Sequence, residues 1–281
     1  MTVPTVRVSG MMPERASDPG EAGQLLAMAG ACIVPWPALD RWAVVAAGEA
    51  VLGARLRARW EPRTLRPHAD PGRRKQVVRA QRLILEGTAA EFDDGRIRAD
   101  PSAIAVEGWG LGDGYPDVVA FLCAAEPVSG GEDYLVDSVE LMTSLGATAE
   151  GRALRRALWT SPVQLRTHPQ HAPQRQPMSR RTRGGRLATL YAPSALLPVI
   201  DAAGEVDSAT LAAQRWHELV AAAAADAPRF ALHRDEALLV DNYRVYHGRD
   251  GYTGERVAYR GWFWSDAVFA YPMVTEDAGE P

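Results

Sequence analysis

D-N-Y-R-V-Y-H-G-R-D-G-Y-T-G-E-R-V-A-Y-R-G-W-F-W, residues 241–264, is the stretch of the chain that decides the fold. The apolar run E-A-L-L-V precedes it at 236–240, and Val, Tyr and Trp recur in its second half, as they do in β-strands. A Gly-Arg-Asp-Gly turn separates the two strand-like segments. This arrangement predicts that His247 and the guanidinium of Arg256 project from neighbouring strands into one cavity. Such a pair suits a metal ligand beside a carboxylate-binding arginine.

The same stretch resembles the C-terminal signature of the TauD/TfdA-like, clavaminate-synthase-like iron(II)/2-oxoglutarate dioxygenases. In that family D-N-x-R-x-x-H-G-R supplies the distal metal histidine, and the first arginine of a following R-x-x-x-R binds the 2-oxoglutarate carboxylate. The resemblance implies that His247 is the distal iron(II) ligand and that Arg256 binds the cosubstrate. It also implies that Arg260 forms a wall of the substrate pocket.

A second part of the sequence extends the resemblance. The apolar run Y-P-D-V-V-A-F-L-C-A-A-E at 115–126 is followed by P-V-S-G-G-E and Y-L-V-D, where the family has P-D-x-x-x-L-x-C and G-G-E-[ST]-x-L-V-D. The resemblance covers residues 101–145 and 232–264. It implies a mainly β fold with α-helices (α+β), a double-stranded β-helix or jelly roll of mostly antiparallel strands with helices packed outside. His247 is expected at the mouth of the barrel with its side chain inward.

The first metal-binding motif of the family, H-x-D or H-x-E, is incomplete in this chain. The family places it about ten residues before the P-D of the apolar strand, and an ungapped count reaches A-V-E at 105–107, so Glu107 aligns with the carboxylate and an alanine with the histidine. With a shorter loop, Trp109 or Leu111 takes the place of the histidine and Asp113 is the alternative carboxylate. The resemblance therefore implies a metal site of His247 with Glu107 or Asp113 that lacks the proximal histidine.

Asp133 is the second departure from the family. It stands after G-G-E, where the family has a serine or threonine whose hydroxyl helps to hold the 2-oxoglutarate carboxylate. A carboxylate at this position repels the cosubstrate and can pair with Arg256 instead. The sequence therefore predicts an Asp133–Arg256 ion pair and negligible binding of 2-oxoglutarate.

These departures leave three interpretations open. In the first, the chain binds iron(II) through His247, a carboxylate and an unforeseen ligand such as His68, His168 or His171, and hydroxylates or desaturates a substrate with 2-oxoglutarate. In the second, it uses neither iron nor 2-oxoglutarate and carries out a non-oxidative cyclisation, elimination or isomerisation. In the third, it is a catalytically silent binding protein.

Charge and hydropathy narrow the range of partners. The formal net charge of -4 argues against a general nucleic-acid binder. No uncharged stretch reaches about 18 residues and the N-terminus lacks the layout of a signal peptide, so a cytoplasmic protein with no membrane partner is expected. A pocket with Arg256, Arg260, Arg249 and Trp109 favours a small anionic molecule, an amino acid or a carrier-tethered acyl group, in specialised metabolism.

The rest of the chain is expected to form one domain, residues 21–281, after a partly ordered leader at 1–20. Residues 165–186, rich in proline and arginine, predict a lid or loop insertion. Cys32 and Cys123 are expected to be buried free thiols. Helical periodicity predicts helices at 21–31, 38–60, 138–158 (a pair broken at Gly146 and Gly151) and 206–227, with a short strand at 32–34.

Overall fold

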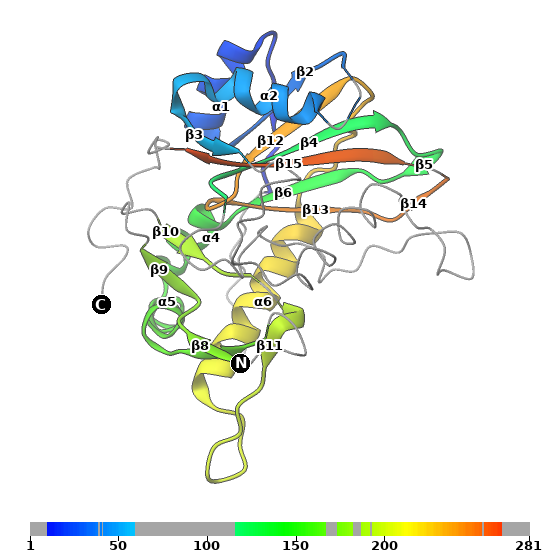
Figure 1. Ribbon diagram of the computed structural model, residues 1–281. Helices are drawn as coiled ribbons and strands as arrows, with labels where there is room; N and C mark the ends of the chain where they lie inside the picture. Colours follow the sequence, from blue (N-terminus) through cyan, green and yellow to red (C-terminus); the bar gives the residue numbers. More distant parts are fainter. Residues whose placement is uncertain are drawn as a thin grey trace.

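The largest sheet of the computed structural model has six strands in the order β1-β2-β12-β4-β15-β3 (Figure 1). The structure describes residues 10–38, 40, 42–59, 116–166, 173–181, 187–191, 193–254 and 256–265. The six strands are β1 (Glu14–Arg15), β2 (Ala31–Pro35), β12 (Glu236–Asp241), β4 (Val118–Ala125), β15 (Val257–Ser265) and β3 (Leu56–Arg59). In this sheet β1 and β2 run parallel, and the other neighbouring pairs are antiparallel, as predicted.

A second layer of strands faces the largest sheet. It consists of two antiparallel pairs, β6 (Asp133–Asp137) with β13 (Val245–Arg249), and β5 (Ser129–Gly130) with β14 (Tyr252–Thr253). In Figure 1, β6 and β13 run below β4 and β15. An apolar cluster joins the layers and includes Leu135 and Val245 of the second layer with Val119, Leu238 and Val240 of the largest sheet. The surfaces of the two layers that meet at this cluster are called the inner face below.

Two helices, α1 (Pro19–Ala29) and α2 (Ala43–Leu52), cover the opposite surface of the largest sheet. Asp18 caps α1 by accepting hydrogen bonds from the backbone N–H groups of Gly20 and Glu21. On α2, Gly48 leaves room for the buried ring of Phe263, because a Cβ atom at this position would collide with that ring. The helices are thereby fixed against the face of the sheet that lies away from the inner face.

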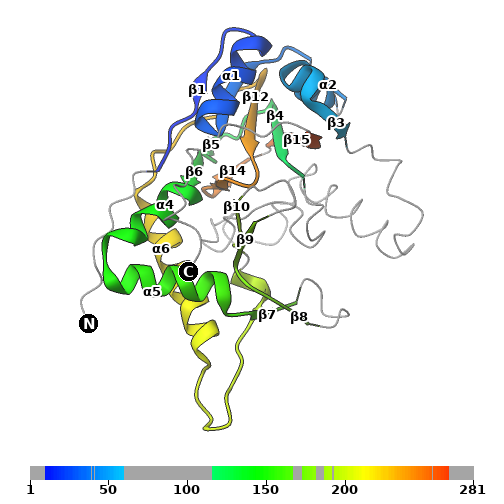
Figure 2. The ribbon, with the colours of Figure 1, turned by 90° about the vertical axis from the view of Figure 1, so that its left-hand side faces the viewer.

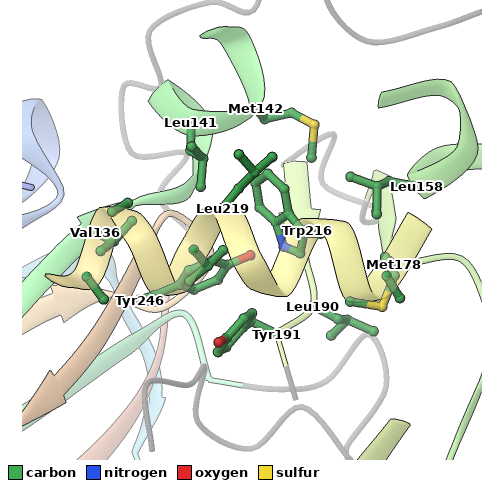
Figure 3. Close-up of a cluster of buried hydrophobic side chains, with 14 of the residues drawn as sticks. Val136, Leu141, Met142, Leu158, Met178, Leu190, Tyr191, Trp216, Leu219 and Tyr246 are labelled. Carbon is green, nitrogen blue, oxygen red and sulfur yellow. The ribbon is translucent and has the colours of Figure 1, made fainter. Parts of the chain in front are cut away.

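The other helices pack below the second layer (Figure 2). They are α4 (Ser138–Ser144), η4 (Leu145–Ala147), α5 (Ala149–Thr160) and α6 (Ser208–Asp226). Trp216 of α6 is fully buried in a cluster with Val136, Met142 and Tyr246 (Figure 3). Small sheets flank these helices. One has the strand order β11 (Leu196–Leu197), β7 (Val163–Leu165) and β8 (Gln174–Gln176), and another pairs β9 (Ser179–Arg181) with β10 (Leu187–Thr189). The short helix η5 (Pro193–Ala195) directly precedes β11. Among the residues that the structure describes, none of the helices combines the length and apolar composition that crossing a lipid bilayer requires.

Several predicted elements are confirmed. The first helix is α1, which begins at Pro19 rather than at residue 21, so the helix includes the end of the predicted leader. The predicted strand at 32–34 lies within β2, and Asp207 caps α6 by accepting a hydrogen bond from the N–H of Thr210. Cys32 and Cys123 are buried free thiols, as expected.

The prediction of one helix at 38–60 is confirmed for residues 43–52 and is wrong at both ends. Gly53, at φ 51°, follows the last residue of α2, and residues 56–59 form β3 instead. Strand β3 pairs with β15 and so completes the edge of the largest sheet. A long-range pairing of this kind overrides the helical periodicity of the local sequence.

Two further expectations need correction. Gly151 does not break the helix pair: it lies in the first turn of α5, where a Cβ atom would collide with the backbone carbonyl of Leu145. The predicted loop at 165–186 contains strands β8 and β9, which pair with β7 and β10. Residues 167–172 and 182–186 of that loop lie outside the described residues.

Candidate functional site

His247 lies in the middle of β13, with its side chain on the inner face. Val245, two residues earlier, belongs to the apolar cluster between the layers, and Leu135 is the partner of His247 across the strand pair. The imidazole ring lies 4.9 Å from the ring of Phe121 on β4, measured between centroids. The inward orientation is therefore confirmed. The apolar run E-A-L-L-V belongs to β12, and a turn separates it from β13, which carries His247.

The D-N-x-R part of the motif anchors the turn that precedes His247. The Arg244 guanidinium donates to Oδ2 of Asp137 at 2.7 Å and to the carbonyl of Met28 at 2.9 Å. Asn242 donates from Nδ2 to the carbonyl of Pro116 at 2.9 Å. Because these bonds reach β6, α1 and the start of β4, they fix where β13 begins and hence where His247 projects.

Arg256 and Asp133 form the ion pair that the sequence predicted. Nη2 of Arg256 lies 2.9 Å from Oδ2 of Asp133, and Nη1 donates to the carbonyl of Gly131 at 2.6 Å. The side chains are 4% and 15% exposed, so the pair is largely withdrawn from water. Both terminal nitrogens of Arg256 are thus engaged by acceptors of the chain itself.

Arg249 adds a second guanidinium beside this carboxylate. It is the direct partner of Asp133 across the β13–β6 pair, and its Cζ lies 5.0 Å from the centre of the Tyr252 ring. Burial raises the pKa of the Asp133 carboxyl, while the charge and hydrogen bond of Arg256 and the charge of Arg249 act in the opposite direction. Burial, and then the charge of Arg256, lower the pKa of Arg249.

Arg260 lies on the largest sheet, on the side that faces the second layer. It pairs with Phe121 of β4, and its Cζ lies 5.2 Å from the centre of the Trp262 ring. Cys123, next along the same face of β4, has its thiol pKa raised to about 11 by burial, so it is neutral at physiological pH. The inner face therefore combines one imidazole and three guanidinium groups with the Asp133 carboxylate.

The expectation that His247 and Arg256 come from neighbouring strands is wrong. His247 lies on β13, which pairs with β6, whereas Arg256 directly precedes β15, which pairs with β4 in the opposite layer. The short strand β14 carries the chain between the layers. The groups converge because the two layers face each other, as in a barrel, and not because their strands are adjacent.

The other predicted metal ligands lie outside the described residues. They are Glu107, Asp113 and the candidates His68, His168 and His171, and the predicted pocket residue Trp109 lies there too. Within the described ranges, no group of three or more His, Cys, Asp or Glu side chains could hold a metal ion. An iron(II) facial triad needs two histidines and one carboxylate, and the described inner face supplies His247 for it. These residues by themselves do not fit iron(II).

The described residues do not fit 2-oxoglutarate either. A carboxylate of the cosubstrate would have to reach Arg256, whose Nη1 and Nη2 bind Gly131 and Asp133. The negative charge of Asp133 would face the incoming carboxylate.

Sequence reasoning missed three groups at this site. These are the carbonyl of Gly131, the ring of Tyr252 and the ring of Phe121. Alternation along the apolar strand could have placed Phe121 on the same face as Cys123. No pattern in the sequence marks a backbone carbonyl as an acceptor for a distant arginine.

Comparison with known protein families identifies one match over a large part of the chain. The model of the taurine catabolism dioxygenase TauD, TfdA family matches residues 109–262, which is more than half of the 281 residues. No curated protein matches the sequence.

Solved structures resemble the fold over nearly the whole chain. A taurine dioxygenase from Burkholderia xenovorans has a TM-score of 0.52 and 16% identity, and the match covers 92% of this chain and 86% of that one. A protein assigned as an alpha-ketoglutarate-dependent taurine dioxygenase from the same organism has a TM-score of 0.54, 13% identity and coverage of 95% and 91%. At these identities the likeness shows the fold alone, the mixed α/β architecture built on a double-stranded β-helix.

Proposed function

This chain belongs to the TauD/TfdA family of dioxygenases, and from that premise we propose that it is an enzyme of small-molecule, specialised metabolism that does not use 2-oxoglutarate. Its substrate is a small anionic or amino-acid-like molecule, free or tethered to a carrier, bound between the two layers of strands. Its reaction is a non-oxidative cyclisation, elimination or isomerisation. The observation that carries the proposal is the ion pair of Asp133 with Arg256.

The energetics of the pair favour the resident carboxylate over a carboxylate from solution. Two unit charges 4 Å apart attract by about 4 kcal/mol at an effective dielectric constant of 20. A free ligand must also give up translational and rotational freedom, at a cost of roughly 4 kcal/mol or more, whereas Asp133 is already in place. Displacing Asp133 would leave a buried carboxylate without its cation, which costs several kcal/mol more, about 3 to 5.

The remaining charged groups suit a reaction that moves protons. His247 can accept or donate a proton at the inner face, which cyclisation, elimination and isomerisation each require. Arg260 and Arg249 can orient an anionic substrate, and Trp109 is a further proposed residue of the substrate pocket. None of these roles requires an oxidant.

The incomplete metal motif supports the same conclusion. Counting back from the P-D at 116–117 places alanine, tryptophan or leucine where the family has its proximal histidine. Glu107, or Asp113 in the shorter alignment, would be the carboxylate beside His247. A site with one histidine and one carboxylate lacks one of the three protein ligands that hold iron(II) in a facial triad.

Family membership favours one alternative, an iron(II)/2-oxoglutarate-dependent hydroxylase or desaturase. It would need a third metal ligand from a segment outside the described residues, such as His68, His168 or His171. It would also need Asp133 to release Arg256 when the cosubstrate binds. A catalytically silent binding protein remains a third candidate, because the same anion-binding groups would serve it.

Metal analysis of the purified full chain, combined with an assay for succinate release from 2-oxoglutarate, tests the proposal. We expect no stoichiometric iron after reconstitution with iron(II), and no succinate above the level of a control without protein. One equivalent of bound iron together with succinate release would refute the proposal in favour of the oxygenase.

A further inference from the structure

Arg249 is a partly buried cation beside a carboxylate that another arginine already holds. On the paired strands β13 and β6, Arg249 and Asp133 are direct partners, but Oδ2 of Asp133 binds Arg256. Within the described ranges, no acidic side chain forms a salt bridge with Arg249, and the Tyr252 ring lies 5.0 Å from its Cζ. Arg249 therefore differs from Arg229, whose guanidinium binds Asp250 at 2.8 Å.

The charges of this cluster leave one positive charge in excess. The guanidinium groups of Arg249 and Arg256 lie beside a single carboxylate, that of Asp133, whose Oδ2 forms an ion pair with Nη2 of Arg256 at 2.9 Å. Cys123 stays neutral because burial raises its thiol pKa to about 11. A desolvated guanidinium is costly unless an anion compensates it, so a bound anion would stabilise this arrangement.

We infer that Arg249 is the residue that binds the substrate's anionic group, and that this group is a single carboxylate. A guanidinium binds a carboxylate through two parallel N–H donors, which fixes the orientation of the ligand as well as its charge. One carboxylate bound at Arg249 would balance the excess positive charge of the group formed by Arg249, Arg256 and Asp133. The inference rests on the proposed function, because it places the substrate in the same site.

The position of Arg249 also directs the rest of the ligand. His247 precedes it by two residues on the same face of β13, a spacing of about 7 Å along a strand. A carboxylate at Arg249 therefore leaves the other end of a short acid beside the imidazole and the Phe121 ring, which lies 4.9 Å from it. A short-chain acid or an amino acid fits this span.

Thermal unfolding of the full chain with a matched pair of probes, butyrate and butyramide, tests the inference at constant ionic strength. We expect butyrate to raise the Tm of the wild type and butyramide to leave it nearly unchanged. In Arg249→Gln the apparent affinity for butyrate should fall by about ten- to a hundredfold, the loss of a hydrogen bond to a charged group. Arg249→Lys should retain part of the binding, because it keeps the charge but loses the two-pronged geometry.

Arg234→Gln is the matched control, because its side chain is 63% exposed and its guanidinium lies 3.9 Å from the Asp235 carboxylate. It should bind butyrate as the wild type does. Equal effects of butyrate and butyramide on the wild type, or unchanged butyrate binding by a folded Arg249→Gln, would overturn the inference. If the wild type and Arg249→Gln bind 2-oxoglutarate equally well, the proposed function is refuted. The inference about Arg249 is not, because that binding does not depend on Arg249.

Discussion

Replacing Asp133 with threonine restores the hydroxyl side chain that the family has at this position. The expected change in the free energy of unfolding follows from the contacts of Asp133. The change removes the carboxylate that lies 2.9 Å from Nη2 of Arg256, whose side chain is 4% exposed. Breaking a buried ion pair by removing one partner costs about 3 to 5 kcal/mol, because the remaining charge is buried without compensation. Nη1 of Arg256 keeps its bond to Gly131, so we expect the lower end, about 3 kcal/mol.

The same variant should regain stability when a carboxylate ligand is supplied. A ligand that binds only the folded state at a hundred times its Kd adds about 2.7 kcal/mol. Urea unfolding of Asp133→Thr with and without 2-oxoglutarate measures this recovery. The control is Asp250→Asn, whose carboxylate is 33% exposed and pairs with Arg229, so its loss should cost about 1 kcal/mol or less with no rescue by 2-oxoglutarate.

Two results would refute this reasoning. If Asp133→Thr unfolds at the same urea concentration as the wild type, the ion pair does not contribute to stability. If the variant is destabilised but 2-oxoglutarate restores nothing, Arg256 does not form a carboxylate site even when its resident anion is gone.

Two further predictions concern the scaffold around the site. Burial lowers the pKa of His217 on α6 to about 4, below its unfolded value of 6.5, so the stability that its neutral form contributes is present above pH 6.5 and lost as the pH falls toward 4. After allowance for solvent screening, this contribution to the free energy of unfolding amounts to about 1 to 2 kcal/mol. Urea unfolding measured between pH 6.5 and 4 should show this loss of stability for the wild type and not for His217→Phe. Arg244→Met should lower the free energy of unfolding by about 3 kcal/mol, because it leaves the buried Asp137 carboxylate without its cation. Calorimetry that finds Arg244→Met as stable as the wild type would contradict the anchoring role of the D-N-x-R motif.

The residues of the site could be predicted because short motifs with fixed spacing carry them. H-G-R and R-x-x-x-R identified His247 and Arg256, and G-G-E identified Asp133. The ion pair followed from elementary charge once a carboxylate stood where the family has a hydroxyl. The inward direction of His247 followed from the alternation of side chains along a strand.

The spatial origin of these residues could not be predicted from local patterns. Strand β14 has two residues, and no periodicity in so short a segment shows that the chain crosses there from one layer to the other. Residues 56–59 read as a helix because helical spacing is a local property, whereas their pairing with β15 depends on residues about 200 positions away. Glu107 and Asp113 lie outside the described residues, so the choice between them stays a prediction.

The most direct test of the account is calorimetric titration of 2-oxoglutarate into the wild-type protein in the presence of iron(II). Because Asp133 supplies the anion that Arg256 would otherwise bind, we predict no saturable heat up to millimolar cosubstrate. Binding with a micromolar Kd would contradict the account, since it would show that Asp133 yields Arg256 to the cosubstrate and that the chain retains the means for iron-dependent oxygenation.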